Sequence, residues 1–449
     1  MLILWLAGLI IFALFLSSYF KEDDAVSAIR KKGRITVLTR NAPTTYYENA
    51  NGFAGFEYDL ATSFAEYLNV EIEFKVFHGI QQILESIKNG RGDIAAAGLT
   101  RTEMRKNDFL FGPDYYTVQQ QVVCRRGNKI PAAPEELPGY SLRVVNNSSY
   151  LEQLQEMKDE IPTLEWEVTE EQDTEQLLEM VWQREIDCTI ADSNIVAINR
   201  RYYPELVVAF PISEKQPLAW PLRNNAVTLQ EELENWLAEL EANGRLTALE
   251  EQYYGHTEFF DYVDIAIFHR RIKSRLPYYR SLFEKAAAKY KVPWTLLAAT
   301  AYQESHWRAK SKSPTGVRGI MMLTLPTAKS LGVKSRLDPA QSIMGGARYL
   351  ARLQKRLPSS LLPEARLHFL LASYNIGLGH IKDARILAKR MGRNPDSWRD
   401  VKEILPLLSR KKYYKTLRHG YARGREPVRY VENIFNYKNI LDRTCQTSL

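Results

Sequence analysis

The feature that most limits how this chain can fold is a change of pattern near residue 256. Before it, short apolar runs typical of strands, such as "ITVLT" at 35–39 and "EIEFKVF" at 71–77, alternate with segments of helical spacing, such as "FEYDLATSFAEYL" at 56–68. From about residue 270 onward every periodic segment has helical spacing. The alternation predicts an α/β fold, and the later region predicts an all-α fold.

These patterns predict two domains. We expect an α/β domain over residues 24–256, closed by two helices around Asn243-Gly244, then a connector at 257–269 and an all-α domain over 270–449. A chain of 449 residues is also too long for one ordinary hydrophobic core.

Charge divides at the same place. From residue 270 to the end there are 37 Lys and Arg against 11 Asp and Glu, whereas residues 1–269 hold 23 against 42. The balances of +26 and −19 predict separate domains with separate partners. Their opposite signs also favour docking of the two domains on each other. A basic domain suits an anionic polymer, either nucleic acid or a glycan, although solvated helix faces would give the same count.

The first twenty residues, "MLILWLAGLIIFALFLSSYF", contain no charged side chain. About twenty apolar residues are enough to cross a bilayer as a helix. Residues 1–20 are therefore predicted to be a membrane anchor or a signal peptide, and either implies export. A buried core helix is the alternative.

Cysteine and histidine spacing gives no sign of a metal site. Cys124, Cys188 and Cys445 are odd in number and lack CxxC spacing, which argues against a disulfide scaffold and favours thiols without a specific role. His306, His368 and His380 lack metal-ligand spacing, so exposed or capping roles are expected. We predict no metal and no cofactor.

The stretch "AYQESHW" at 301–307 places Glu304 at the end of an apolar helical run. Leu297, Thr300 and Ala301 share its helical face. Desolvation on such a face disfavours the carboxylate, so its pKa should be raised, as a general acid requires. The alternative is a glutamate that points into solvent at a helix end.

Two glycine-containing stretches follow the predicted helix of Glu304. "SKSPTGVRGIMML" follows the helix with glycines that let backbone pass close to other groups, and "ASYNIG" places Tyr374 and Asn375 at the end of an apolar run. This Tyr-Asn pair is either an ordinary helix end or a site for an amide-bearing substrate.

These motifs, in this order and followed by a late tyrosine, resemble the soluble lytic transglycosylase catalytic domain, which has a goose-type lysozyme fold. The resemblance covers roughly residues 270–440. It implies that Glu304 is the catalytic acid and base, and that the substrate-binding residues are Ser313, Met322, Tyr374, Asn375 and Tyr430. This chain departs from the family at Gly319-Ile320-Met321-Met322, because Met322 replaces a glutamine and cannot reproduce an amide's donors.

The same resemblance implies a reaction at the bond between N-acetylmuramic acid and N-acetylglucosamine in peptidoglycan. One carboxyl group would serve as acid and then as base, leaving a 1,6-anhydro end without water. Ordinary glycosidases need a second carboxylate. Residues 285–337 contain no acidic residue except Glu304, which fits the single-acid scheme.

The first domain resembles the family 3 extracellular solute-binding proteins for polar amino acids. "GDIAAAGLTRTEMRKNDFLFGPDYY" and "TIADSNIVAINR" carry the resemblance. It implies a two-lobed α/β domain with a ligand cleft between the lobes, in which Arg105 binds a ligand's α-carboxylate and Asp192 its ammonium group. A wall-derived peptide or amino acid in this cleft would then regulate the other domain, unless both residues are inherited scaffold in an empty cleft.

The order of the whole chain is similar to that of one family of membrane-bound lytic murein transglycosylases. We therefore expect a lyase at the periplasmic face of the envelope, peripheral to the outer membrane unless an inner-membrane anchor is retained. The alternatives are a hydrolytic muramidase and a non-catalytic solute sensor. For the basic residues Lys411, Lys412, Arg423, Arg425 and Arg429, a glycan or membrane surface is preferred over nucleic acid.

Overall fold

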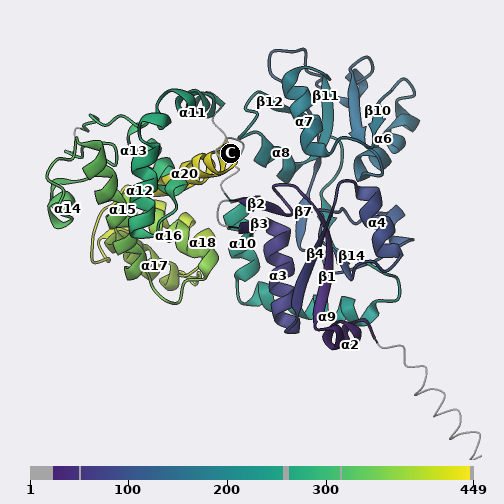
Figure 1. Cartoon of the computed structure of the whole chain (residues 1–449), viewed down its shortest axis with the longest axis horizontal. Helices are drawn as coiled ribbons and strands as arrows, with labels where there is room; N and C mark the ends of the chain where they lie inside the picture. The colour runs from purple at the N-terminus through teal and green to yellow at the C-terminus, as the bar shows by residue number, and fades with distance from the viewer. Residues whose placement is uncertain (1–23, 50–51, 256–261, 314–315, 445–449) are drawn as a thin grey trace, which may run out of the picture.

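The computed structural model describes residues 24–49, 52–255, 262–313 and 316–444, as an α/β part of two lobes beside a helical part (Figure 1). The predicted change from alternating strands and helices to helices alone is confirmed. Several predicted elements match closely: "EIEFKVF" is β4 (Glu71–Phe77) and "FEYDLATSFAEYL" is α3 (Phe56–Leu68).

The first lobe is built on a parallel sheet of order β4-β1-β5, with β1 at Arg34–Arg40 and β5 at Ile94–Ala95. Both faces of β1 are covered. Ile35 and Val37 pack into one core with α3, whereas Leu38 packs with α4 (Ile80–Lys88) on the other face. The lobe is completed by α2 (Ala25–Lys32), α5 (Glu103–Lys106), α9 (Val227–Ala242) and two short strand pairs, β2 (Tyr47–Asn49) with β3 (Gly52–Ala54) and β6 (Leu110–Phe111) with β14 (Pro221–Leu222).

The second lobe contains a five-stranded mixed sheet of order β10-β9-β11-β8-β12. One face packs on α6 (Ser149–Glu160) and the other on α7 (Thr174–Gln183) and α8 (Ser193–Asn199). The chain passes between the lobes twice, where β7 (Tyr116–Val118) pairs with β13 (Gln216–Leu218). The strands of the sheet are β8 (Gln120–Arg125), β9 (Leu142–Val145), β10 (Glu167–Thr169), β11 (Cys188–Asp192) and β12 (Leu206–Pro211), and a 3₁₀ turn η1 spans Pro134–Glu136.

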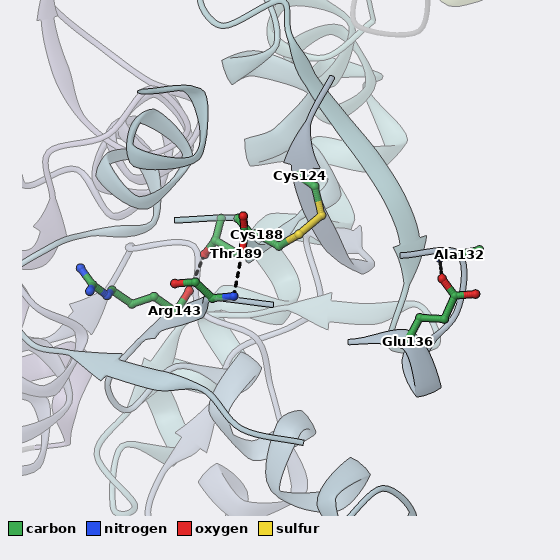
Figure 2. Close-up of a disulfide and its surroundings, with 8 residues drawn as sticks. Cys124, Ala132, Glu136, Arg143, Cys188 and Thr189 are labelled. Carbon is green, nitrogen blue, oxygen red and sulfur yellow. Dashed lines mark hydrogen bonds between the residues drawn. A yellow bond between two sulfur atoms is a disulfide. The ribbon is translucent and has the colours of Figure 1, made fainter. Parts of the chain in front are cut away.

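The structure corrects the interpretation of two cysteines as thiols. Cys124 on β8 and Cys188 on β11 lie opposite each other in an antiparallel pair and form a disulfide (Figure 2). Beside it, the Thr189 hydroxyl donates to the Arg143 carbonyl oxygen at 2.7 Å, which ties β11 to β9. The 64-residue separation hides this pairing, since only strand register brings the two residues together. Cys445 lies outside the described residues.

The helical part packs around one core of its own. The helices that carry Glu304, Tyr374 and Tyr430 pack together within it: α13 packs on α20, and α16 packs on α15, α17 and α20 (Figure 1). Its elements are α11 (Tyr262–Ser274), η2 (Leu276–Tyr278), α12 (Arg280–Tyr290), α13 (Trp294–Ser305), α14 (Leu325–Ser330), α15 (Pro339–Arg356), α16 (Pro363–Ile376), α17 (Leu378–Arg390), α18 (Trp398–Ile404), η3 (Leu405–Ser409), α19 (Lys411–Tyr414) and α20 (Arg425–Thr444).

Of the predicted connector at 257–269, the described residues 262–269 are helical. Helix α11 begins at Tyr262, and its residues Ile265, Phe268 and Ile272 are buried in the helical core. Apolar residues recur in α11 at helical spacing, so the helix packs one face against this core.

The two parts touch through α10 (Arg245–Tyr253), which packs against α16 and α18. The Lys402 ammonium lies 2.8 Å from a carboxylate oxygen of Glu251, and Arg399 pairs with Glu250. In both pairs the acid comes from the acidic part and the base from the basic part. A third pair, Arg245 with Glu364 at 3.1 Å, has the opposite polarity.

Within the described ranges, every helix is too short or too polar to span a bilayer. The predicted signal peptide or membrane anchor at residues 1–20 lies outside these ranges.

Candidate active site

Helix α13 places Glu304 at the edge of the helical core. Leu297, Thr300 and Ala301, on the same face, are fully buried, whereas Glu304 itself is half-buried near the last turn. The helix ends at Ser305 and is capped by His306, whose left-handed backbone (φ 53°) turns the chain away. The Arg275 guanidinium donates to the His306 carbonyl at 2.9 Å. The glutamate therefore lies on a fixed helix end with apolar surface behind it.

Burial raises the pKa of Glu304 to about 7, and a hydrogen bond from Tyr430 opposes this rise. The Tyr430 hydroxyl donates to Oε1 of Glu304 at 2.7 Å. Tyr430 comes from α20, 126 residues later, and is itself buried. A carboxyl group with a pKa near neutrality can hold a proton and release it at the same pH, which suits one group acting as acid and base.

The loop after α13 is fixed against the helices by buried serines. Ser305 donates to the Ile320 carbonyl at 2.8 Å, and the Met321 amide donates to the Ser342 hydroxyl at 3.3 Å. Gly319 has φ 89°, and a Cβ there would lie 1.7 Å from the Arg336 carbonyl oxygen. Only glycine allows this close approach of the loop to the Arg336 backbone.

Tyr374, near the end of α16, holds the same loop from another side. Its hydroxyl donates to the Met321 carbonyl at 2.9 Å, and its ring lies against Tyr349 with 5.3 Å between centroids. The Glu304 charge contributes to raising the pKa of the Tyr374 hydroxyl, behind the larger effect of burial. Glu304, Tyr374 and Tyr430 therefore form one electrostatic cluster.

The remaining predicted residues of this domain lie on the loop after α13 and near the end of α16. Asn375 is exposed beside Tyr374. Met322 is half-buried in the loop with φ 43°, and Ser313 is half-buried, with its amide donating to the Val317 carbonyl at 3.0 Å. Met322 and Ser313 belong to the loop that Tyr374 holds.

Sequence reasoning missed Ser305, Ser342 and Tyr349. The two serines act on backbone groups 15 and 21 residues away, and Tyr349 contacts Tyr374 from α15. The hydroxyl side chain directly after Glu304 was a sequence signal for Ser305, but a weak one. Small polar residues in apolar helices are common, so their partners cannot be read from spacing.

The structure differs from the expected role of one histidine. His306 caps α13, as expected, but His368 is buried between the rings of Trp398 and Phe435. Burial lowers the pKa of His368 to about 3, so this ring is neutral. His368 therefore packs in the core as a neutral aromatic ring.

Arg105 and Asp192 lie between the lobes of the α/β part. Arg105 is buried and donates to the carbonyls of Thr100 and Asn147, both at 2.9 Å, so it joins the two lobes. Asp192 is buried and accepts from the Tyr150 hydroxyl at 3.1 Å through Oδ2, whereas Oδ1 has no hydrogen-bond partner among the described residues. Burial raises the pKa of Asp192 to about 6.

A buried ion pair closes the same cleft. Arg40 on β1 of the first lobe lies 2.8 Å from Glu175 on α7 of the second. Because Arg105 already has backbone acceptors and Arg40 already has a carboxylate, the structure shows the two lobes closed on each other.

Comparison with known proteins agrees with this division. Residues 34–256 match the family model of bacterial extracellular solute-binding proteins, family 3, and residues 281–396 match the transglycosylase SLT domain. The second match includes Glu304, Ser313, Met322, Tyr374 and Asn375, whereas Tyr430 lies beyond it. The predicted fold class is therefore confirmed. Among solved structures, an ancestral arginine-binding protein bound to arginine is 22% identical with a TM-score of 0.46, covering 49% of this chain and 98% of that chain.

Relatives match nearly the whole chain. A protein of Saccharophagus degradans named membrane-bound lytic murein transglycosylase F is 46% identical over 92% of this chain and 83% of the relative. A protein of Shewanella pealeana with the same name is 45% identical over 94% of this chain and 87% of the relative. Both domains and their order are shared, so this chain belongs to the membrane-bound lytic murein transglycosylase F family.

Proposed function

We propose that this protein is a peptidoglycan lytic transglycosylase in which Glu304 performs both proton transfers. The observation that carries the proposal is a half-buried carboxyl group with a pKa of about 7, held by Tyr430 beside a rigid loop. A carboxyl group of ordinary pKa would be ionised near neutral pH and could not donate a proton.

The reaction needs no second carboxylate. Protonated Glu304 donates to the oxygen between N-acetylmuramic acid and N-acetylglucosamine as that oxygen's bond to the muramyl anomeric carbon breaks. The resulting carboxylate takes the proton of the muramyl 6-hydroxyl, whose oxygen bonds to the same carbon. Glu304 is protonated again, and the products are a 1,6-anhydromuramyl end and a free 4-hydroxyl on the N-acetylglucosamine.

The residues around Glu304 have supporting roles in this proposal. Tyr430 positions the carboxyl group and stabilises its ionised form for the second step. The loop that Tyr374 holds, with Ser313 and Met322, and the exposed amide of Asn375 contact the glycan. Met322 offers a thioether where related domains carry an amide, so any sugar contact from this position is apolar.

The test is digestion of purified sacculi, with the products weighed by mass spectrometry. Wild type should release anhydro products, lighter by one water than reducing ones. Glu304→Gln should cut product formation by at least about a hundredfold, because general acid–base catalysis contributes about 10²–10⁴. Glu284→Gln, a change at a half-exposed glutamate of α12, is the matched control and should cleave normally. Reducing ends would indicate a muramidase, and no cleavage by wild type would indicate a sensor.

We also propose that the cleft between the lobes binds a wall-derived peptide or amino acid, with Arg105 on its carboxylate and Asp192 on its ammonium group. The unpartnered Oδ1 of Asp192 supports this assignment. The lobes must open first, because Arg105 is held by two carbonyl groups. Calorimetry should detect binding of stem peptides that Arg105→Ala abolishes, and the peptide should change turnover. Neither effect would occur if these residues were only scaffold.

The family name places the enzyme at a membrane. For this chain we propose the periplasmic face of the envelope, with peripheral attachment to the outer membrane. Fractionation combined with N-terminal sequencing tests this and shows whether residues 1–20 are removed. Recovery of uncleaved protein in the inner membrane would contradict it.

A further inference from the structure

A cavity of about 720 Å³ lies away from Glu304, where the two lobes and the helical part meet. Tyr47 lines it from the first lobe, Glu175 and Arg201 from the second, and Glu364 and Phe435 from the helical part. Neither Arg105 nor Asp192 is among the described residues that line it. It therefore adjoins the cleft discussed above, with which it shares Glu175, but it does not include the two residues assigned to that cleft.

Arg201 is the unexplained group in this cavity. Its side chain is only 3% exposed, and Nε and one terminal nitrogen have no hydrogen-bond partner among the described residues. Burial lowers the pKa of Arg201 to about 10, which leaves it charged near neutral pH, and the groups that oppose this lowering are tyrosine hydroxyls. A buried cation without a counter-ion is costly. Core packing alone does not explain an arginine here.

A second group with an unpartnered oxygen lines the same cavity from the helical part. Glu364, in the first turn of α16, accepts from Nε of Arg245 at 3.1 Å through Oε1. Its Oε2 is buried and has no partner among the described residues. Leu367 and Phe435 add apolar surface. The cavity thus offers an unmatched cation, an unmatched acceptor and an apolar wall.

We propose that this cavity binds a small zwitterion, an amino acid or dipeptide, with its carboxylate on Arg201 and its ammonium group on Glu364. The volume lies within the range of about 300–1,000 Å³ for ligand sites. Six carboxylates line the cavity against three basic side chains, which disfavours a dianion such as phosphate and favours a ligand that also carries a cation.

Such a ligand bridges the α/β part to the helices of the candidate active site. Glu364 lies in the first turn of α16, which carries Tyr374, and Phe435 lies on α20 five residues after Tyr430. Occupancy therefore stabilises the docked arrangement of the two parts. It also fixes the two helices that position the Glu304 cluster.

The test uses the full chain with Arg105→Ala, so that the cleft between the lobes does not contribute. L-lysine, L-leucine and L-alanyl-L-alanine are titrated separately by calorimetry. At least one should bind with one-to-one stoichiometry, and its C-terminal amide and its N-acetyl form should each bind at least about tenfold more weakly, since each removes a charge-assisted hydrogen bond. The assay measures binding, so its result is independent of cleavage.

Variants locate the site. Adding Arg201→Gln should abolish binding, Glu364→Gln should weaken it at least about tenfold, and Arg200→Gln, a change at the neighbouring arginine outside the cavity, should leave it unchanged. Thermal melting should show that Arg201→Gln is as stable as its parent or more so, because an unmatched buried charge is removed. Failure of all three probes to bind, or binding that survives Arg201→Gln, would overturn the proposal.

Discussion

At the scale of single residues, the protein's chemistry depends on one carboxyl group and its neighbour. Burial raises the pKa of Glu304 to about 7, and the Tyr430 hydrogen bond lowers it from what burial alone would give. The two effects together hold the group near the point where it can both give and take a proton. Two measurements separate them.

The first is the pH profile of Tyr430→Phe. Losing a hydrogen bond to the carboxylate should raise the pKa of Glu304 by about one unit, since such bonds contribute about 1.5 kcal/mol or more. Activity falls as Glu304 loses its proton, so the alkaline limb of kcat/KM should move to higher pH. Tyr374→Phe is the control, because that hydroxyl donates to Met321 and should leave the midpoint in place. If the alkaline limb of the kcat/KM profile does not move in Tyr430→Phe, Tyr430 does not lower the pKa of Glu304.

The second is the stability of Glu304→Gln as a function of pH. A carboxyl group whose pKa is higher in the folded than in the unfolded state stabilises the fold at low pH, and this advantage is lost as pH rises through about 7. Glu304→Gln should therefore gain on wild type between pH 5 and 8, by up to about 3 kcal/mol. Urea unfolding at several pH values measures the difference. A difference that does not grow with pH contradicts the burial argument.

At the scale of elements, the loop after α13 is more constrained than its glycine-rich sequence suggests. Gly316 and Gly319 both have left-handed φ, near 86° and 89°, but only Gly319 is crowded by backbone. The same substitution at Gly316 and at Gly319 therefore separates the effect of backbone strain from the effect of close packing.

Gly319→Ala should lower the melting temperature and the rate of glycan cleavage together, because its Cβ would displace the Arg336 carbonyl and with it the loop. Gly316→Ala has open space and should cost only about 1–2 kcal/mol of left-handed strain, with cleavage retained. Thermal melting and sacculus digestion of both variants provide the comparison. Equal effects would mean that the close approach does not matter.

At the scale of the whole molecule, charge connects the two parts. The sequence divides into an acidic and a basic region, and Glu251 with Lys402 is the most buried ion pair between them. Glu251 is 4% exposed, so removing its partner leaves a charge without compensation.

Lys402→Met should therefore destabilise the protein by about 3 kcal/mol, the usual cost of breaking a buried pair. Adding Glu251→Gln should recover a large part of that loss, because the stranded carboxylate disappears. Denaturant unfolding of the two single variants and the double variant forms a double-mutant cycle. Additive effects would show that the two charges do not interact in the folded protein.

Local patterns predicted much of this fold. Strands β1 and β4 and helices α3 and α13 follow from apolar residues repeating at periods that a short stretch displays by itself. Helix α11, in the predicted connector, carries many charges, and only the burial of its own Phe268 and Ile272 in the helical core makes it part of that domain. Glu304 was identified for the same local reason, since its neighbours on one helix decide its desolvation.

What the sequence by itself determined is the order of the elements, the division of charge and the apolar setting of Glu304. Each depends on residues within a few turns of one another. Only the tertiary structure decided that Tyr430 reaches Glu304 across 126 residues, that Cys124 meets Cys188 and that Arg201 faces a cavity without a counter-ion. Hydrogen bonds, disulfides and cavities require groups to meet in space, and distant segments meet only through the packing of the whole chain.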